Sequence, residues 1–151
     1  MVMTTLAKTY SLEMSLEEIW PRFQGIPLIH LATMDGDHPR VRPVALITCN
    51  HQLWAVTHTS WKKTEQIRNN GKMEFTLLFR VSKETGCIRA TGRCDIVGDI
   101  QTKSTVAEAV PFFYDYWDSP EDSEYTLISL KPSILRVDSP EPRGKYTITI
   151  E

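Results

Sequence analysis

The chain has 151 residues and a formal charge of −2, with 41% hydrophobic and 24% charged residues. This length suits one domain with a substantial core, and no apolar run approaches the roughly 20 residues of a membrane helix. The slightly acidic balance argues against a general nucleic-acid binder, which needs a basic face for the phosphates. The first residues lack a secretory signal pattern, and the three cysteines show no C-x2-C spacing. These features predict a cytoplasmic protein with reduced thiols.

Short β-branched runs separated by turn residues dominate the chain. The first predicted element is a helix, because Ser15 and Glu18 form a capping-box pattern, and Pro21 is expected to end or kink it. Asp35-Gly36 predicts the turn of a hairpin. The predicted strands cover 26–34, 39–49, 53–57, 73–81, 87–97 and 125–137, and the other predicted helices cover 61–69 and 100–110.

This order of elements favours an antiparallel β-barrel with a few short helices. A parallel sheet would need a crossover of a dozen or more residues between most of its strands, and the chain has no room for them. We predict a single domain over 1–151, with its core at about 23–137 and a C-terminal tail over 138–151. His30 lies in an apolar run and is expected in the core.

Two adjacent lysines lie at the predicted start of the helix over 61–69. Lys62 and Lys63 are unfavourable there, because a helix N-terminus carries about half a positive charge. A bound anion would reverse that cost, since free N–H groups and two ammonium groups together can cradle a phosphate. Spacing alone leaves open that both lysines are solvated surface residues. The same turn offers three hydroxyl groups as further phosphate ligands, those of Thr57, Thr59 and Ser60.

A second cationic feature lies upstream, in the strand predicted over 39–49. Arg40 and Arg42 share one face of that strand, because side chains alternate along it. If the hairpin packs beside the next strand, a guanidinium could reach the same anion. Pro43 has no N–H, which is typical of an edge strand or of a bulge beside a groove. The alternative that the pattern leaves open is an exposed strand carrying two arginines.

Three segments, in this order and spacing, carry a resemblance to a known family: LATMDGDHPRVRPVALI, LWAVTHTSWKKTEQIRNN and GCIRATGRCDIV. From about Phe23 to Val137 the chain resembles the pyridoxamine 5'-phosphate oxidase-like FMN-binding split β-barrels, and most of all the general stress protein 26-like branch. The resemblance implies a mainly β, antiparallel, Greek-key-like split barrel. It also implies a non-covalent FMN cofactor.

The family's cofactor contacts can be carried over by position. In the family, the arginine-bearing strand lies along the flavin, the next strand end approaches the ring and ribityl chain, and the basic pair holds the phosphate. Lys63 lies four residues before Ile67, as the family pattern requires. The predicted cofactor-binding residues are Arg42, Pro43, Val44, Val56, Thr57, His58, Thr59, Ser60, Lys62, Lys63 and Trp117.

The chain departs from the oxidases of this family at three places. Cys87 stands where they have a glutamine that contacts the flavin, and a thiol cannot reproduce the amide hydrogen bonds. Ile47 stands where they place a lysine for the vitamin phosphate, and the C-terminus lacks their arginine-rich segment. The resemblance therefore supports the fold and the flavin, and it argues against oxidation of pyridoxamine phosphate.

The predicted function is that of an FMN-dependent oxidoreductase whose substrate is unknown. The flavin would carry the redox chemistry, so no catalytic acid–base pair is expected. The expected partners are a second copy of the chain and a small-molecule electron donor or acceptor, with NAD(P)H as one candidate. The resemblance implies a homodimer with two flavins at its interface. The aromatic segment over 112–117 fits either that interface or a plug in the mouth of its own barrel.

Other classes of function remain as alternatives. The same barrel could bind haem, a deazaflavin or stored flavin without turnover, and His58 or Cys87 would then be the candidate axial ligands of a haem iron. The spacing of the four histidines indicates no metal site. An OB-fold-like binder of oligonucleotides is disfavoured, because the chain is acidic and has no basic aromatic strand face.

Overall fold

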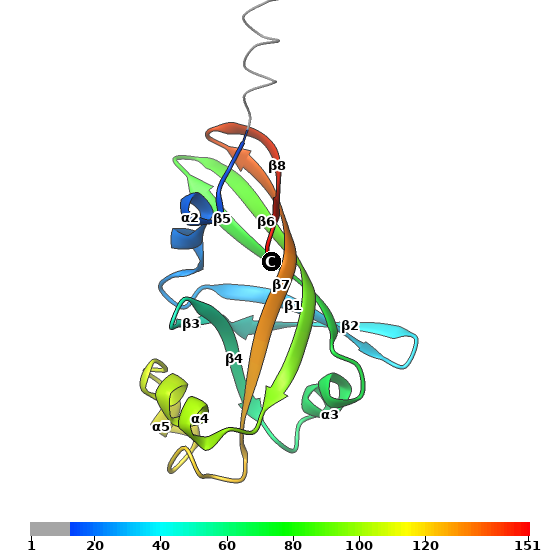
Figure 1. The fold of residues 1–151 in the computed structure, drawn as a ribbon, viewed down its shortest axis with the longest axis vertical. Helices are drawn as coiled ribbons and strands as arrows, with labels where there is room; N and C mark the ends of the chain where they lie inside the picture. Colours follow the sequence, from blue (N-terminus) through cyan, green and yellow to red (C-terminus); the bar gives the residue numbers. More distant parts are fainter. Residues whose placement is uncertain (1–12) are drawn as a thin grey trace, which may run out of the picture.

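Most of the described chain, residues 13–151, forms one antiparallel sheet in this computed structural model (Figure 1). Apolar side chains alternate with polar ones along the strands, so that Phe75 and Leu77 are fully buried while Glu74 is exposed. The strands are β1 (Leu28–Asp35), β2 (His38–Ala45), β3 (Ile47–Cys49), β4 (Gln52–His58), β5 (Lys72–Val81), β6 (Glu84–Val97), β7 (Tyr125–Pro140) and β8 (Arg143–Thr149).

The sheet curls because its two outermost strands are consecutive in the chain. The strand order is β2-β1-β5-β6-β7-β4-β3, with β8 paired to β7. The single strand predicted over 39–49 is wrong, since Leu46 divides it into β2 and β3. Leu46 is buried and donates its N–H to the carbonyl of Pro27 at 2.9 Å, where the chain crosses from one end of the sheet to the other. The predicted mainly antiparallel β, split-barrel fold is confirmed.

Short helices flank the sheet. Ser15 Oγ accepts the N–H of Glu18 at 3.2 Å, which confirms the predicted cap. The α-helix then ends before Pro21 and tightens into a 3-10 turn, because proline has no N–H to donate. Within residues 13–151, no helix is long and apolar enough to cross a membrane. The helical elements are α2 (Leu16–Ile19), η1 (Trp20–Phe23), α3 (Lys62–Asn69), α4 (Ile100–Glu108) and α5 (Phe113–Tyr116).

Two further predictions differ from the structure. The segment expected as a tail contains β8, which pairs with β7 and buries Tyr146 and Ile148. His30 is exposed rather than in the core, because β1 buries only one of its two faces. Its neighbours Ile29 and Leu31 are fully buried.

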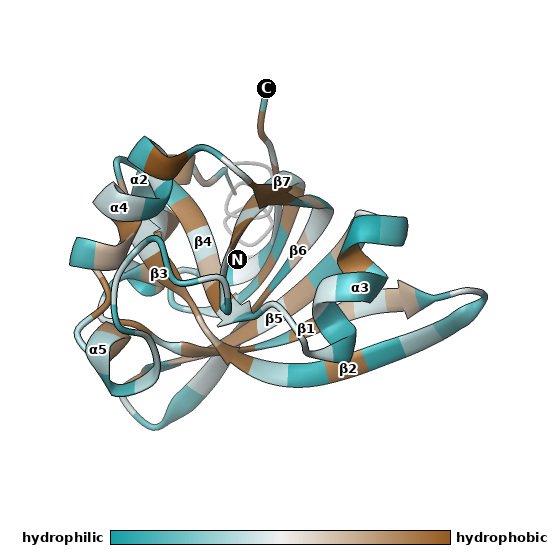
Figure 2. Cartoon of the chain, turned by 90° about the horizontal axis from the view of Figure 1, so that it is seen from below, coloured by the Kyte–Doolittle hydropathy of each residue, from teal (hydrophilic) through white to brown (hydrophobic). Residues whose placement is uncertain are grey.

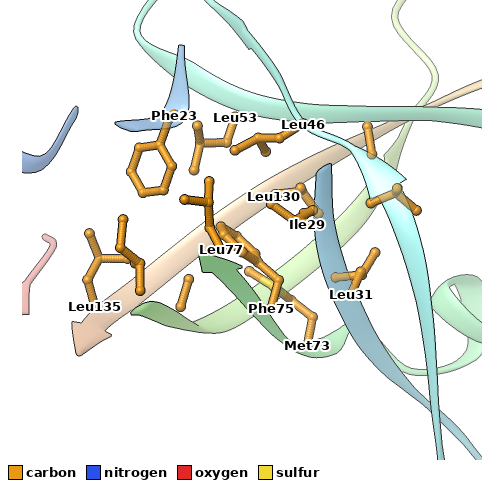
Figure 3. Packing of buried hydrophobic residues seen from close by; sticks show 14 of the residues in the cluster. Phe23, Ile29, Leu31, Leu46, Leu53, Met73, Phe75, Leu77, Leu130 and Leu135 are labelled. Atoms are coloured by element: carbon orange, nitrogen blue, oxygen red, sulfur yellow. The ribbon is translucent and has the colours of Figure 1, made fainter. Parts of the chain in front are cut away.

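The apolar side chains form two clusters. The larger lies inside the curled sheet, where residues of β1, β5 and β7 meet Phe23 of η1 (Figure 3). The smaller lies under α4 and α5 and includes Phe113, Trp117 and Tyr125. Figure 2 shows that β2, by contrast, is largely hydrophilic along its length. The polar strand β2 and the smaller apolar cluster border the candidate site.

Candidate functional site

Two adjoining hollows lie where the ends of β2 and β4 meet the start of α3. We call the first the aromatic cavity; it has a volume of about 280 Å³. The second, the cationic recess, has a volume of about 630 Å³. The aromatic cavity is lined by Val44, Ala45, Val56, Thr57, His58, Trp61, Lys63, Phe112, Tyr116 and Trp117. The cationic recess is lined by Asp35, Arg40, Val41, Arg42, Pro43, Trp61, Lys62, Lys63 and Gln66.

The turn between β4 and α3 places the two lysines beside these hollows. The carbonyl of His58 accepts the N–H of Trp61 at 3.2 Å and the hydroxyl of Thr64 at 2.8 Å, which fixes a tight exit from the strand. Trp61 is the N-cap of α3, and no side chain caps the helix there. Lys62 and Lys63 therefore occupy the first turn of a helix whose N-terminal N–H groups lack a side-chain acceptor.

The cationic recess carries positive charge that the described residues do not balance. Arg40 pairs with Asp35 at 3.5 Å. For Arg42, Lys62 and Lys63, no carboxylate of residues 13–151 lies within salt-bridge distance. Burial, and then the nearby guanidinium of Arg42, lower the pKa of the Lys63 ammonium. Together with the helix dipole, this arrangement favours a bound anion.

The aromatic cavity is walled by rings, and two of the residues that line it carry a buried polar atom. The ring of His58 lies 4.5 Å from that of Trp61 and 5.0 Å from that of Trp117. Thr57 Oγ1 and Trp117 Nε1 are buried without a hydrogen-bond partner among the described residues. Thr57 is 2% exposed and Trp117 is 4% exposed. Leaving such an atom unsatisfied costs about 1–3 kcal/mol, so each of them is expected to find a partner in water or in a bound ligand.

The structure brings most of the predicted site residues together. Those that line one or both hollows are Arg42, Pro43, Val44, Val56, Thr57, His58, Lys62, Lys63 and Trp117. Thr59 and Ser60 line neither hollow. The hydroxyl of Thr59 donates to the carbonyl of Ser123 at 2.7 Å, and that of Ser60 donates to the carboxylate of Glu124 at 2.8 Å. The loop before β7 thus engages the two hydroxyls that were expected to face a phosphate.

The aromatic segment has both buried and exposed side chains. Phe113 is fully buried and Trp117 nearly so, as expected of a plug in the same chain. Tyr114 and Tyr116 are 73% and 59% exposed, which leaves them available to a partner. Cys87 lines neither hollow.

Sequence reasoning missed several residues of the site. Phe112 and Tyr116 line the aromatic cavity, and the sequence offered no signal beyond their aromatic character. Gln66 lines the cationic recess and had a usable signal. It follows Lys63 by three residues, so that both side chains lie on one face of the helix.

The donor set fits a planar ligand that bears ring acceptors at one end and a phosphate at the other. The aromatic cavity offers flat apolar walls, an indole N–H and a threonine hydroxyl. The cationic recess offers ammonium and guanidinium groups. No group of three or more histidine, cysteine or acidic side chains that could hold a metal occurs in the part of the chain that the structure describes.

The lowered pKa of Lys63 predicts how the ligand-free protein responds to pH. Between that lowered pKa and the ordinary value of 10.5, the unfolded chain binds more protons than the folded one. The contribution of Lys63 to the free energy of unfolding therefore rises with pH in this window. In Lys63→Met, which removes the buried ammonium, we expect this rise to be lost.

Urea unfolding between pH 7 and 11 measures this difference. The gain in stability of Lys63→Met over the wild type should be largest at neutral pH and shrink as the pH rises. Lys72→Met, at an exposed position at the start of β5, is the matched control. A constant difference between Lys63→Met and the wild type would contradict the prediction.

The fold has known counterparts among solved structures, although no family model and no curated protein matches the sequence. A NimC/NimA family protein from Clostridium acetobutylicum is 23% identical, with a TM-score of 0.75 over 90% of this chain and 92% of that one. A protein related to general stress protein 26, of the pyridoxinephosphate oxidase family and from the same organism, is 15% identical, with a TM-score of 0.72 over 89% and 94%.

A heme binding protein from Mycobacterium smegmatis is also similar in structure. It is 11% identical, with a TM-score of 0.72 over 91% of this chain and 59% of that one. At sequence identities this low, the similarity to these structures shows the fold alone. The chain has the split-barrel fold of the pyridoxamine 5'-phosphate oxidase-like and general stress protein 26-like structures, in agreement with the resemblance in its sequence.

Proposed function

We propose that this protein binds FMN non-covalently across the aromatic cavity and the cationic recess and acts as an oxidoreductase. One observation carries the proposal. A recess with three cations that no carboxylate of residues 13–151 pairs adjoins a cavity walled by aromatic rings, and Trp61 and Lys63 line both. A ligand with a planar polar ring and a phosphate tail would satisfy both hollows at once.

The phosphate would lie at the start of α3. Lys63 and Lys62 are its proposed ligands, with Arg42 as a third cation. The helix dipole and the uncapped N–H groups of α3 act in the same direction, because both favour negative charge. Binding would also relieve the repulsion between Lys63 and Arg42, whose proximity contributes to the lowered pKa of Lys63.

The ring system would lie in the aromatic cavity. Val44 and Val56 supply apolar contacts there, and the rings of His58 and Trp117 supply flat surfaces. Thr57 Oγ1 and Trp117 Nε1 would find partners among the nitrogen and oxygen atoms of a flavin ring. Bound FMN would supply the redox chemistry, while this chain orients it and excludes water. The proposed partner in turnover is a small-molecule electron donor or acceptor, with NAD(P)H as a candidate.

Vitamin B6 oxidation is not the proposed reaction. Ile47 stands where the oxidases of the resembling family place a lysine for the vitamin phosphate. Its side chain is 1% exposed and packs in the smaller apolar cluster beside Trp54. An apolar buried residue there leaves the position without a cation for a second phosphate.

A second copy of the chain would cover the outer face of the sheet. Leu28, Val41 and Leu78 are each more than 60% exposed on this face. Val41 pairs with Ala32 of β1 and also lines the cationic recess, so this face of the sheet borders the site. Single exposed apolar residues are ordinary, whereas several large ones on one face of a sheet support an interface there. This supports the homodimer that the family resemblance implies.

The visible spectrum of the freshly purified protein tests the identity of the cofactor. We expect the two broad bands and green fluorescence of a flavin, released as FMN on denaturation. A sharp Soret band would instead favour haem, for which His58 in the aromatic cavity is the candidate ligand and the heme binding protein of similar fold is the precedent. Bound flavin that no electron donor bleaches would contradict the oxidoreductase part of the proposal and favour a storage or sensory role.

Replacement of Lys63 tests the position of the phosphate. Lys63→Ala removes a charge-assisted hydrogen bond and should weaken FMN binding by about 1.5–3 kcal/mol. Quenching of flavin fluorescence on titration measures the affinity. Lys72→Ala, which alters an exposed lysine outside both hollows, should leave the affinity unchanged. Equal affinities of Lys63→Ala and the wild type would show that the phosphate lies elsewhere.

A charge introduced on the outer face of the sheet tests whether a second copy of the chain binds there. Leu78→Glu should convert a dimer into a monomer, because an unpaired carboxylate in an apolar interface is strongly disfavoured. Sedimentation equilibrium measures the mass, and Thr147→Glu on the exposed side of β8 is the control. A monomeric wild type, or a Leu78→Glu variant that stays dimeric, would overturn this part of the proposal.

A further inference from the structure

The guanidinium of Arg42 is held by three neutral acceptors. Its Nη1 donates to Thr33 Oγ1 at 2.6 Å and to the carbonyl of Leu31 at 3.3 Å. Its Nη2 donates to Gln66 Oε1 at 2.7 Å. Thr33 is 2% exposed, so the side chain of Arg42 is tied from β2 to the buried face of β1 and to α3. A long flexible side chain is thereby restricted to one place at the edge of the cationic recess.

It matters that these acceptors are neutral, because a second cation, Lys63, lies beside Arg42. Burial lowers the pKa of Arg42, and Arg42 in turn contributes to the lowered pKa of Lys63. A glutamate in place of Gln66 would hold the guanidinium equally well by geometry, but it would cancel one positive charge in the recess. The amide fixes Arg42 and leaves the charge of the recess intact. Gln66 Nε2 also donates to no described side chain, so it keeps two donors for an anion.

We propose that Gln66, supported by Thr33, is a positioning residue that holds Arg42 beside the phosphate of the bound cofactor without neutralising it. This inference rests on the proposed function, because it assigns the residue that prepares the same site. It predicts that the identity of residue 66 sets the affinity for the phosphate and leaves that for the ring untouched. A purely structural role, in which Gln66 only ties α3 to the sheet, predicts equal effects on both.

The isosteric variant Gln66→Glu separates these two roles. Glutamate forms helix as well as glutamine does, so α3 is expected to keep its fold. Affinities for FMN and for riboflavin, which lacks the phosphate, are measured by fluorescence titration. We expect FMN to bind about tenfold or more weakly, because the added carboxylate competes for Arg42 and repels the phosphate, while riboflavin changes less than about twofold.

The control variant adds the same charge elsewhere on the same helix. Asn69→Asp is also an amide-to-acid change, at an exposed position in the last turn of α3. It should leave both affinities within about twofold of the wild type, because it lies outside the recess. An equal loss of FMN and riboflavin binding in Gln66→Glu, or an equal loss of FMN binding in Asn69→Asp, would overturn the inference.

Thr33→Val tests the hydrogen bond from Arg42 to Thr33, because valine has nearly the same shape as threonine but no hydroxyl. It removes the acceptor at 2.6 Å and leaves the Nη1 group with the weaker bond to Leu31. FMN affinity should fall several-fold and riboflavin affinity should not. Unchanged FMN affinity in a folded Thr33→Val protein would contradict the role of Thr33.

The pH profile of the ligand-free protein provides a readout that does not depend on flavin. In the wild type, the contribution of Lys63 to the unfolding free energy, measured as the difference from Lys63→Met, rises with pH through this window. In Gln66→Glu the new carboxylate should offset the contribution of Arg42 to the lowered pKa of Lys63 and reduce that rise, whereas Asn69→Asp should keep it. An undiminished rise in Gln66→Glu would overturn the positioning role. A wild type that binds no FMN, with this pH response intact, would instead overturn the proposed function and leave only the positioning of Arg42 by Gln66.

Discussion

Uncompensated positive charge at one point of the barrel is the constraint on which the rest of the site depends. Lys62 and Lys63 occupy the first turn of a helix, where the dipole already disfavours cations, and Arg42 lies beside them. No described carboxylate relieves these three groups. Such an arrangement raises the free energy of the ligand-free fold, and it lowers the free energy of a complex with an anion. It is therefore an arrangement suited to binding rather than to stability.

The topology of the barrel brings this charge next to a flat apolar surface. The crossing of the chain at Leu46 places the end of β2 beside the end of β4, so that Val44 and Val56 line one cavity. The tight turn after His58, at the end of β4, then places the start of α3 at the edge of this cavity. The smaller apolar cluster supplies Trp117 as the opposite wall. Charge and aromatic surface thus meet at Trp61, from segments far apart in sequence.

Local patterns predicted most of the fold. Alternation of apolar residues located the strands, and Ser15 with Glu18 located the start of the first helix, because both signals depend on near neighbours. The division at Leu46 and the pairing of β8 could not be predicted in this way. Both depend on contacts between distant segments, such as the bond from Leu46 to Pro27. The exposure of His30 likewise depends on which face of β1 the rest of the sheet covers.

The residues of the site likewise fall into those that local sequence patterns predicted and those that depend on contacts between distant segments. The two lysines were visible as a local violation of the helix-dipole rule, and the family resemblance identified the strand of Arg42. The engagement of Thr59 and Ser60 by the loop before β7 was invisible, since Ser123 and Glu124 lie more than sixty residues away. The hydrogen bond between Arg42 and Gln66 also joins separate elements. Only the spacing of Gln66 from Lys63 hinted that it faces the same recess.

A crystal structure of the protein with saturating FMN would show how the two hollows are occupied. We predict a phosphate oxygen about 3 Å from Lys63 Nζ, at the start of α3, with the flavin ring against His58 and Trp117. FMN with its phosphate in bulk solvent, or both hollows empty of flavin, would contradict it.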